Sequence, residues 1–436
     1  MNPKEQNQFI DRLTKKKSRV MVIGLGYTGL PLVECIANAG FNVLGFDKNS
    51  FKIASLIRGE SYLETFSSSR LASLLKTGRF LPKGNLVDTQ PCDVYWICVP
   101  TPLSNGAPTL DLIFDAVASI ANHTKKPFLV VVSSTSFPGT SRLLSEKLQN
   151  DCELVLGEDF FLACSPERED PGNKKYNTQN LPRVFGASDQ NSLKISRIFF
   201  KLLFDEIYEA SSIETAEASK LMENVYRAVN IALANEWSEI CKGLNLNVWE
   251  VVNLASTKPF GFQAFFPGPG VGGHCIPVDP YYLITKLKST GINSDLINLA
   301  CDLNKKRPLK IVEKIIDLVQ KHHNSILNFN ILLIGIGYKK NMADIRESPS
   351  LEILHKLSEL GFNARWHDPL VVDQIPELSK LKESILTKSL LKQQGLCLVL
   401  VDHDQVDWAM LENNANLIID TVNSLHLRES KQVIRI

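Results

Sequence analysis

A single cysteine, Cys275, stands in the segment of this chain best suited to chemistry. The eight residues before it, 267–274, hold four glycines and two prolines and read Pro-Gly-Pro-Gly-Val-Gly-Gly-His. Prolines restrict the path of a backbone, and glycines let it approach a ligand with no side chain in the way. The pattern therefore indicates a thiol used as a nucleophile. The alternative is a tight turn that happens to precede an inert, buried cysteine.

A glycine pattern near the start of the chain predicts a nucleotide site. An apolar stretch, 19–24, runs into Gly24-Leu-Gly26-Tyr-Thr-Gly29, and a helical pattern follows to about Ala39. The first glycine makes the turn, the second lets the backbone reach a pyrophosphate, and the third lets helix and strand pack closely. The positive end of the helix then faces the phosphates.

An acidic residue completes this pattern. A second apolar stretch, 41–46, ends on Asp47, which is 18 residues after the last glycine. A carboxylate there accepts hydrogen bonds from the adenosine ribose hydroxyls and repels a 2′-phosphate. NAD is therefore favoured over NADP as the cofactor, although Lys48 and Lys52 weaken that preference.

Polar residues follow three further apolar, strand-like stretches. Thr101 comes after 94–99, Thr135 after 129–132, and Glu167 after 160–164. In an open parallel sheet, ligands bind beyond the carboxyl ends of the strands. These residues are thus expected near cofactor and substrate, the alternative being that they only end strands and cap turns.

A long helical pattern without proline covers about 213–244. Such a helix is typical of a connection between domains or of a dimer interface. Lys220 and Asn224 lie four residues apart and so share one face of it. A lysine on a helix is more commonly a solvated charge, and Lys305-Lys-Arg307 in the next helical region is interpreted as a solvated turn.

A second strand, glycine and helix pattern begins at about residue 330. Its Gly335-Ile-Gly337 lacks the third glycine, which makes it a poorer cofactor site. The predicted fold is α/β, with two Rossmann-like doubly wound domains joined by a long central helix. The expected parts are an N-terminal arm (1–18), an NAD-binding domain (19–205), a central helical, catalytic-loop and dimerisation domain (206–325), and a second Rossmann-like domain (326–436).

Composition excludes several classes of function. The chain has 436 residues and a formal net charge of +1, so no charge excess favours nucleic acid or an anionic membrane. No apolar run is long enough for a membrane span, and the polar start is expected to form a short solvated helix or arm. Nine scattered cysteines without a C-x-x-C pair indicate reduced thiols, a cytoplasmic protein and no metal site.

Seven motifs together resemble the UDP-glucose/GDP-mannose 6-dehydrogenase family, over about residues 19–425. In chain order they are Gly24-Leu-Gly-Tyr-Thr-Gly29, Val99-Pro-Thr-Pro102, Ser134-Thr-Ser-Phe-Pro-Gly-Thr140, Ser165-Pro-Glu-Arg168, Lys220-Leu-Met-Glu-Asn224, Gly270-Val-Gly-Gly-His-Cys-Ile-Pro-Val-Asp279 and Lys339-Lys-Asn-Met-Ala-Asp-Ile-Arg-Glu-Ser-Pro349. The loop before Cys275 is most similar to the UDP-N-acetylglucosamine 6-dehydrogenase branch.

Three departures from the family pattern stand out. Ser134-Thr-Ser-Phe replaces Ser-Thr-Val-x, and Ser-Pro-Glu-Arg is followed by Glu-Asp-Pro-Gly. Upstream of the cysteine loop, where UDP-glucose members place an arginine from a partner subunit in the sugar site, Lys258 is the basic residue. That substitution leaves the cross-subunit contact open.

The resemblance implies oxidation of a sugar C6 hydroxyl to a carboxylate with two NAD+. It makes Cys275 the nucleophile, Lys220 and Asn224 the oxyanion partners, and Asp279 the residue that orients Lys220 or a water; Lys220 also favours the thiolate. Glu167 is expected to be the base for thioester hydrolysis, with Thr135 holding the water. His274 is interpreted as a backbone or nucleotide contact.

The remaining expected contacts divide between cofactor and substrate. The cofactor contacts are Gly24, Gly26, Tyr27, Thr28, Gly29, Asp47, Lys52, Pro100, Thr101, Thr135 and Arg346. The substrate contacts are Glu167, Lys220, Asn224, Phe266, Gly270, Gly272 and Lys339, with Lys339 on the phosphate. The expected partners are a UDP-sugar and further copies of the chain, as a homodimer or higher oligomer.

UDP-N-acetylglucosamine is the expected substrate, with UDP-N-acetylgalactosamine, UDP-N-acetylmannosamine and UDP-glucose as alternatives. An NAD-dependent sugar-nucleotide epimerase is a second class; it releases no net NADH and normally uses a Tyr-x-x-x-Lys pair, which we take to be missing here. A non-catalytic nucleotide-binding protein is a third. It would tend to lose Cys275, Lys220 or Glu167, all of which are present.

Overall fold

The computed structural model describes residues 3–104, 107–170, 173, 175–273, 275–323, 325–371, 378, 381–425 and 433–436. The chain divides into two compact units. Unit 1 comprises Met1–Glu223 and Tyr281–Thr290, and unit 2 comprises Asn224–Pro280 and Gly291–Ile436. His274 lies outside the described residues.

Unit 1 is built on an eight-stranded sheet with the order β10-β9-β8-β7-β4-β1-β2-β3. Neighbouring strands are parallel except β8 and β9, which are antiparallel. The strands are β1 (Arg19–Ile23), β2 (Asn42–Phe46), β3 (Phe80–Lys83), β4 (Cys92–Ile97), β7 (Thr124–Val132), β8 (Phe160–Cys164), β9 (Arg183–Ala187) and β10 (Ile207–Glu209). The strands predicted in 19–24, 41–46, 94–99, 129–132 and 160–164 are confirmed within one or a few residues.

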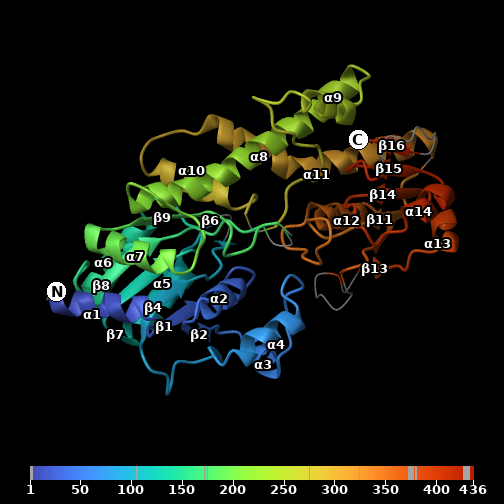
Figure 1. Ribbon diagram of the computed structural model, residues 1–436. Helices are drawn as coiled ribbons and strands as arrows, with labels where there is room; N and C mark the ends of the chain where they lie inside the picture. The colour runs from blue at the N-terminus through green and yellow to red at the C-terminus, as the bar shows by residue number, and fades with distance from the viewer. Residues whose placement is uncertain are drawn as a thin grey trace. The chain divides into compact units, whose positions relative to one another are not determined.

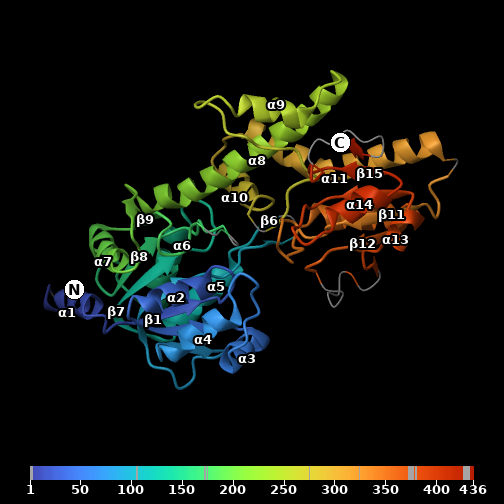
Figure 2. The same cartoon turned by 45° about the vertical axis from the view of Figure 1, so that its right-hand side comes forward.

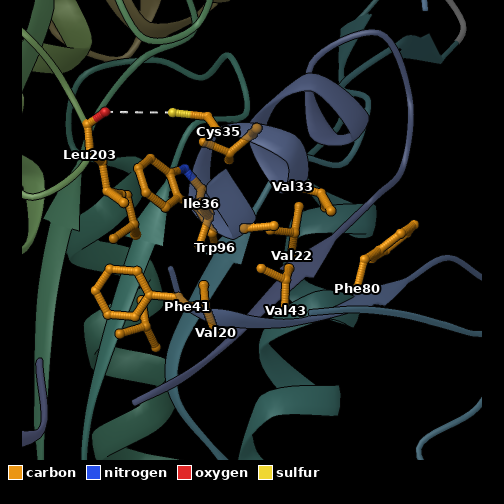
Figure 3. Packing of buried hydrophobic residues seen from close by; sticks show 14 of the residues in the cluster. Val20, Val22, Val33, Cys35, Ile36, Phe41, Val43, Phe80, Trp96 and Leu203 are labelled. Carbon is orange, nitrogen blue, oxygen red and sulfur yellow. Dashed lines mark hydrogen bonds between the residues drawn. The ribbon is translucent and has the colours of Figure 1, made fainter. Parts of the chain in front are cut away.

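Helices cover both faces of this sheet (Figure 1). On one face lie α1 (Pro3–Thr14), α2 (Gly29–Asn38), α3 (Ser50–Arg58), α4 (Ser68–Lys76) and α7 (Gln190–Lys201), and on the other α5 (Asp111–Ala121) and α6 (Thr140–Cys152). Strand side chains alternate between two apolar clusters, because successive residues point to opposite faces. Figure 3 shows the first cluster, where Trp96 and Val22 of the sheet pack below α2.

The N-terminal segment forms a helix, but it is not solvated all round. Phe9 and Leu13 of α1 are fully buried in the first apolar cluster. The ring of Phe9 lies 5.8 Å from that of Phe161 on β8. The expectation of a solvated helix or arm is therefore wrong for this face, because a four-residue spacing puts both apolar side chains on the sheet.

Unit 2 holds a six-stranded, fully parallel sheet with the order β13-β12-β11-β14-β15-β16. The strands are β11 (Asn330–Ile334), β12 (Asn363–His367), β13 (Lys382–Glu383), β14 (Leu396–Val399), β15 (Ile418–Asp420) and β16 (Val433–Arg435). Helices α11 (Asp295–His322) and α12 (Pro349–Glu359) pack on one face, and α13 (Lys388–Gln393) and α14 (Trp408–Asn414) on the other. Two Rossmann-like sheets in one α/β chain match the prediction.

The long helix predicted between them is α8 (Ile213–Gly243), 31 residues that begin in unit 1 and end in unit 2 (Figures 1 and 2). The remaining elements are α9 (Val248–Ala255), α10 (Asp279–Lys288) and the short hairpin of β5 (Leu103–Ser104) and β6 (Ala107–Pro108). In the part of the chain that the structure describes, no helix combines the length and apolar character that crossing a bilayer requires.

Lys305-Lys-Arg307 does not form the solvated turn that was expected. The three residues lie within α11, and Arg307 is 2% exposed. A buried guanidinium needs partners to offset its lost hydration. Those partners, described below, are the Gly268 carbonyl in the segment that precedes Cys275 and the Glu239 carboxylate of α8.

Candidate active site

The glycine loop after β1 has the geometry that a dinucleotide requires. Gly24 has a φ of +94°, and a Cβ on it would lie 2.6 Å from the carbonyl oxygen of Cys98. A Cβ on Gly29 would lie 1.8 Å from the carbonyl oxygen of Gly24, so strand and helix approach too closely for any side chain. A Cβ on Gly26 would meet nothing within 4 Å, which leaves its backbone face open. The loop thus fits the pyrophosphate of NAD.

Asp47 lies beside this loop at the end of β2. Its Oδ2 accepts from the backbone N–H of Leu25 at 2.9 Å, and its Oδ1 accepts from that of Asn49 at 2.9 Å. Lys52 Nζ lies 3.0 Å from Oδ2. The sequence-predicted Lys52 thus contacts Asp47 directly, and the pair fixes the carboxylate where ribose hydroxyls are bound in this fold.

Tyr62 was not recognised from the sequence. Its hydroxyl donates to the carbonyl of Leu25 inside the glycine loop, and Lys52 Nζ lies 5.8 Å from the centre of its ring. Desolvation, and second the charge of Asp47, raise the pKa of this phenol. No local motif marks Tyr62, because its partner is 37 residues away in the sequence.

The other predicted cofactor residues of unit 1 lie at the same edge of the sheet, since they follow the carboxyl ends of its strands. Tyr27 and Thr28 precede α2 and are partly buried, and Pro100 is exposed. Thr101 is buried, and its carbonyl accepts from the Tyr282 hydroxyl at 3.2 Å. Thr135 follows β7 and is partly buried.

Tyr282 and Lys286 of α10 have the Tyr-x-x-x-Lys spacing, so the expectation that the chain lacks this pair is wrong. Tyr282 is fully buried and its hydroxyl also donates to the carbonyl of Thr109 at 2.8 Å. Lys286 Nζ lies 5.3 Å from the centre of the Phe137 ring. A buried phenol that donates to backbone carbonyls supports the structure of unit 1 and is not placed to take a proton from a sugar.

Glu167 follows β8 at the same edge of the sheet. Its Oε1 accepts from the backbone N–H of Arg168 at 2.7 Å and of Glu169 at 2.6 Å. Its Oε2 lies 3.5 Å from Nη1 of the buried Arg183 on β9. These donors hold the carboxylate in one orientation, which a base needs.

Helix α8 is tied to unit 1 on both sides of Lys220. One turn before it, the Glu217 carboxylate accepts from the backbone N–H groups of Gly139 at 2.6 Å and Ser141 at 2.8 Å, at the start of α6. After it, Glu223 pairs with Arg168 Nε at 2.8 Å. Lys220 itself is buried, so the alternative that it is an ordinary solvated charge on a helix is wrong.

In unit 2, Asn224 is held by Asp279. Both side chains are buried, and Asn224 Nδ2 donates to Asp279 Oδ2. The amide orientation follows from chemistry, since an ionised carboxylate accepts hydrogen bonds and donates none. The second N–H of the amide is thus left to donate elsewhere. Asp279 was expected to orient Lys220 or a water, and this contact shows it orienting Asn224.

Cys275 is exposed, whereas the other eight cysteines are buried or partly buried. Its carbonyl accepts from the N–H groups of Val278 at 3.2 Å and Asp279 at 2.8 Å, which forms a turn into α10. The thiol is therefore not buried, as the alternative would require.

The glycines before Cys275 allow close contact with the segment after β11. A Cβ on Gly272 would lie 2.6 Å from Cβ of Tyr338 and 2.8 Å from the carbonyl oxygen of Glu347, and one on Gly270 would lie 2.9 Å from Cβ of Pro349. Gly273 donates its N–H to the carbonyl of Arg346 at 2.9 Å. Gly270 and Gly272, which are both predicted substrate residues, therefore also allow the cysteine loop to pack closely against the loop after β11.

Gly268 is held through both its backbone N–H and its backbone carbonyl, an arrangement that we call the Gly268 clamp. Arg307 Nε donates to its carbonyl at 3.0 Å, and its N–H donates to Asn235 Oδ1 at 3.0 Å. Arg307 also pairs with Glu239 at 2.7 Å, as does Lys314 at 2.5 Å. Burial lowers the pKa of Arg307 and Lys314, against the opposing effect of Glu239. Sequence reasoning missed this clamp because its members are scattered over more than 70 residues.

Three further predicted residues lie in unit 2. Phe266 is partly exposed and stacks on Trp249, with ring centres 5.3 Å apart. Lys339 is partly buried in the turn after Gly337. Arg346 is half-exposed and bonds Asp344 through Nε at 3.0 Å, which fixes its guanidinium.

The second glycine loop, Gly335-Ile-Gly337, has an acidic residue too, but that residue is fully engaged. Asp368, just after β12, accepts from the N–H groups of Ile336, Gly337, Leu370 and Val371 and from Nε2 of the buried His403 at 3.1 Å. Although burial opposes it, the hydrogen bond and charge of His403 and these backbone donors lower the pKa of Asp368 to about 2. A carboxylate has about four lone-pair positions, so none is left for ribose hydroxyls.

Three family models match the chain in succession. They describe the NAD-binding domain (residues 18–208), the central domain (214–306) and the UDP-binding domain (332–427) of the UDP-glucose/GDP-mannose dehydrogenase family. The chain belongs to this family. It is an NAD-dependent UDP-sugar dehydrogenase, and the N-terminal glycine loop of this dehydrogenase lies in the NAD-binding match.

The names of the relatives include two different UDP-sugars. The chain is 35% identical to the UDP-N-acetyl-D-mannosamine dehydrogenase of Methanocaldococcus jannaschii, over 94% of this chain and 93% of that protein. It is 34% identical to the UDP-N-acetyl-D-glucosamine 6-dehydrogenase of Pseudomonas aeruginosa, over 82% and 84%. The solved UDP-D-ManNAc dehydrogenase of Pyrococcus horikoshii superposes with a TM-score of 0.87 at 29% identity, covering 96% of this chain and 99% of that one.

Two alanine substitutions in the cysteine loop test whether its glycines are needed for close packing or only for a flexible backbone. Gly272→Ala places its Cβ 2.6 Å from Tyr338 and 2.8 Å from a backbone oxygen, so the loop must move and the dehydrogenase should lose at least tenfold in kcat/KM. Gly268→Ala meets nothing within 4 Å and should retain activity within about twofold. NADH release and the rate of Cys275 alkylation measure both; equal losses in the two variants would contradict this packing argument.

Proposed function

We propose that this dehydrogenase oxidises the C6 hydroxyl of a UDP-N-acetylhexosamine to the carboxylate, through covalent intermediates on Cys275. The observation that carries the proposal is the exposed thiol at the end of a glycine loop that packs on the loop after β11. Two NAD+ supply the oxidant, each accepting one hydride. The remaining steps depend on side chains of this chain.

The thiol is needed because an alcohol loses one hydride to become an aldehyde, which has no second hydride to give up readily. Addition of the Cys275 thiolate to the aldehyde carbon gives a thiohemiacetal, whose C–H can again release a hydride. The product of that second oxidation is a thioester. Water then adds to the thioester carbon, the C–S bond breaks, and the carboxylate leaves with the thiolate restored.

Lys220 and Asn224 are proposed to stabilise the negative oxygen in these steps. Their burial supports this role, since a donor excluded from water stabilises an oxyanion more strongly. Asp279 holds the Asn224 amide so that its second N–H is available. Lys220 is also proposed to favour the thiolate form of Cys275.

Glu167 is proposed as the base that takes a proton from the hydrolytic water, and Thr135 as the residue that helps to hold that water. The hydrogen bonds that fix the Glu167 carboxylate support the first role. Both residues follow carboxyl ends of parallel strands, where ligands bind in such sheets.

The proposed binding residues divide between the two nucleotides. Residues 19–205 are proposed to bind NAD, 206–325 to supply the catalytic loop and dimer contacts, and 326–436 to bind the UDP-sugar. On the NAD side these are Gly24, Gly26, Tyr27, Thr28, Gly29, Asp47, Lys52, Pro100, Thr101, Thr135 and Arg346. On the sugar side Lys339 contacts the phosphate, with Phe266, Gly270 and Gly272 shaping the pocket.

Removing the thiol is expected to stop net formation of the uronic acid. Cys275→Ala should abolish it, because no second hydride donor forms, while Cys275→Ser should retain slow turnover or accumulate a covalent intermediate. The wild type should form two NADH per sugar. Mass spectrometry of the product together with the NADH yield measures both. Uronic acid formed by Cys275→Ala at the wild-type rate, or one NADH per sugar, would refute the mechanism.

The sugar is proposed to be UDP-N-acetylglucosamine, from the Pro-Gly-rich sequence before Cys275. UDP-N-acetylmannosamine is a second candidate, because several relatives carry that name. The identities of 35% and 34% to relatives of the two types do not separate them.

A panel of UDP-N-acetylglucosamine, UDP-N-acetylmannosamine, UDP-N-acetylgalactosamine and UDP-glucose should resolve the choice. We expect kcat/KM for UDP-N-acetylglucosamine to exceed that for UDP-glucose by at least tenfold, since a pocket built for the acetamido group leaves polar groups unpaired without it. NADH release measures each rate. A higher kcat/KM with UDP-N-acetylmannosamine would transfer the assignment to that sugar.

We further propose that the chain forms a homodimer through α8. Four large apolar side chains in the unit 2 part of this helix are exposed along one stripe, at spacings of seven, four and three: Tyr226, Leu233, Trp237 and Ile240. A stripe of this kind on a monomer would leave apolar surface in water, and a second copy of the stripe covers it.

Ile240→Glu should therefore shift the protein toward monomer, because it buries a charge in the proposed interface. Lys242→Gln, on the opposite face of α8, is the matched control and should leave the mass unchanged. Light scattering after size-exclusion chromatography gives the mass. A wild type that is monomeric at micromolar concentration, or an Ile240→Glu variant with the wild-type mass, would contradict the proposal.

A further inference from the structure

His403 is a buried histidine to which the proposed mechanism gives no role. It follows β14 in unit 2 and is fully buried. Its Nδ1 accepts from the backbone N–H of Asn341 at 3.0 Å, and its Nε2 lies 3.1 Å from Asp368 Oδ2. A backbone N–H can only donate and an ionised carboxylate can only accept, so Nδ1 presents a lone pair and Nε2 carries the hydrogen. Each ring nitrogen therefore has one fixed role.

Asp368 extends this contact to the second glycine loop. The oxygen that meets His403, Oδ2, also accepts from the backbone N–H of Gly337 at 3.1 Å. His403 thus joins two points on one stretch of backbone, Gly337 through Asp368 and Asn341 directly. Three residues lie between those points, and the middle one is Lys339. The histidine therefore holds both ends of the turn that carries the proposed phosphate contact, which we call the Lys339 turn.

The Lys339 turn depends on such contacts because its backbone is unusual at both ends. Asn341 has a φ of +60°, in the left-handed region that few residues other than glycine adopt. At the other end, a Cβ on Gly337 would lie 2.7 Å from the carbonyl oxygen of Met342, so the chain returns very close to its own start. Backbone of this kind persists only where its surroundings hold it.

The residues on either side of His403 hold the adjacent lysine. Lys340 Nζ lies 3.0 Å from Asp402 Oδ1 and 2.9 Å from Asp404 Oδ1. A lysine whose charge is matched by two carboxylates is a poor partner for a phosphate, which is itself negative. The segment that carries His403 therefore orders the turn and favours Lys339 over Lys340 as the phosphate contact.

We propose that His403 is a positioning residue for the phosphate of the UDP-sugar, because it holds the Lys339 turn at both ends. The inference rests on the proposed contact between Lys339 and that phosphate. His403 is fully buried, so it acts through the backbone of the turn and not by touching the ligand. A lysine on an ordered turn loses less conformational freedom on binding, which strengthens its contact with a charged group.

Binding of UDP and of uridine to the full-length chain, followed by ligand-observed NMR, tests this role without catalysis. His403→Gln keeps a donor toward Asp368 and loses the acceptor for the Asn341 N–H, so it releases one end of the turn. We expect the Kd of UDP to rise about fivefold, and that of uridine, which has no phosphate, to change by less than about twofold. His355→Gln, at an exposed histidine on α12, is the matched control and should bind both ligands as the wild type does.

His403→Asn releases the other end of the turn. Its side-chain oxygen takes the place of Nδ1 and keeps the acceptor for Asn341, but its shorter amide does not reach Asp368. We expect the same pattern, a weaker affinity for UDP with little change for uridine. This variant also carries the test if His403→Gln does not fold.

A double-mutant cycle separates a positioning role from a purely structural one. Lys339→Gln should raise the Kd of UDP about tenfold, because a charge-assisted contact is lost. If His403 acts through Lys339, adding His403→Gln to Lys339→Gln should raise the Kd by less than about a further twofold, since the effects of coupled residues do not add.

The outcomes distinguish the inference from the proposed function. Wild-type affinity of Lys339→Gln for UDP would refute the proposed phosphate contact, and the positioning role with it. Weaker UDP binding by Lys339→Gln but not by the His403 variants would overturn the positioning role alone. Equal weakening of UDP and uridine binding, or additive losses in the double variant, would show that His403 only supports the fold of unit 2.

Discussion

The contact between the cysteine loop and the loop after β11 is the constraint on which the proposed active site depends. Gly270 and Gly272 leave no room for a Cβ against Pro349, Tyr338 and the Glu347 carbonyl. Arg307 and Asn235 hold the same loop from the other side through Gly268. The exposed thiol is therefore carried by a backbone fixed at both ends, which a loop of this glycine content could not achieve through its own conformational preferences.

Helix α8 imposes the second constraint, and it does so with polar contacts. Glu217 caps the start of α6, and Glu223 pairs with Arg168 beside Glu167. Glu217 is buried, and a buried carboxylate is costly unless it is matched, so its hydrogen bonds to α6 help to specify one register of the helix. Lys220 lies between these two contacts on α8, so they fix its position as well.

The sequence predicted the parts of this structure that depend on local patterns. Continuous apolar stretches located the strands, and glycine spacing located the cofactor loop, whose tight geometry Gly24 and Gly29 confirm. It failed where a residue's role depends on distant partners. Arg307 was taken as solvated because nothing near it in the sequence signals Gly268, and the burial of Phe9 depends on contact with Phe161 of β8, which is distant in the sequence.

The different use of the acidic residue in the two Rossmann-like sheets has a kinetic consequence. Asp368 is saturated by backbone N–H groups and His403, whereas Asp47 stands at the loop that fits a dinucleotide. Under the proposed reaction, both oxidations then draw on one dinucleotide position. Spent cofactor must depart and a fresh molecule must arrive while the half-oxidised sugar stays in place. A covalent tether to Cys275 would prevent the reactive aldehyde from escaping during that exchange.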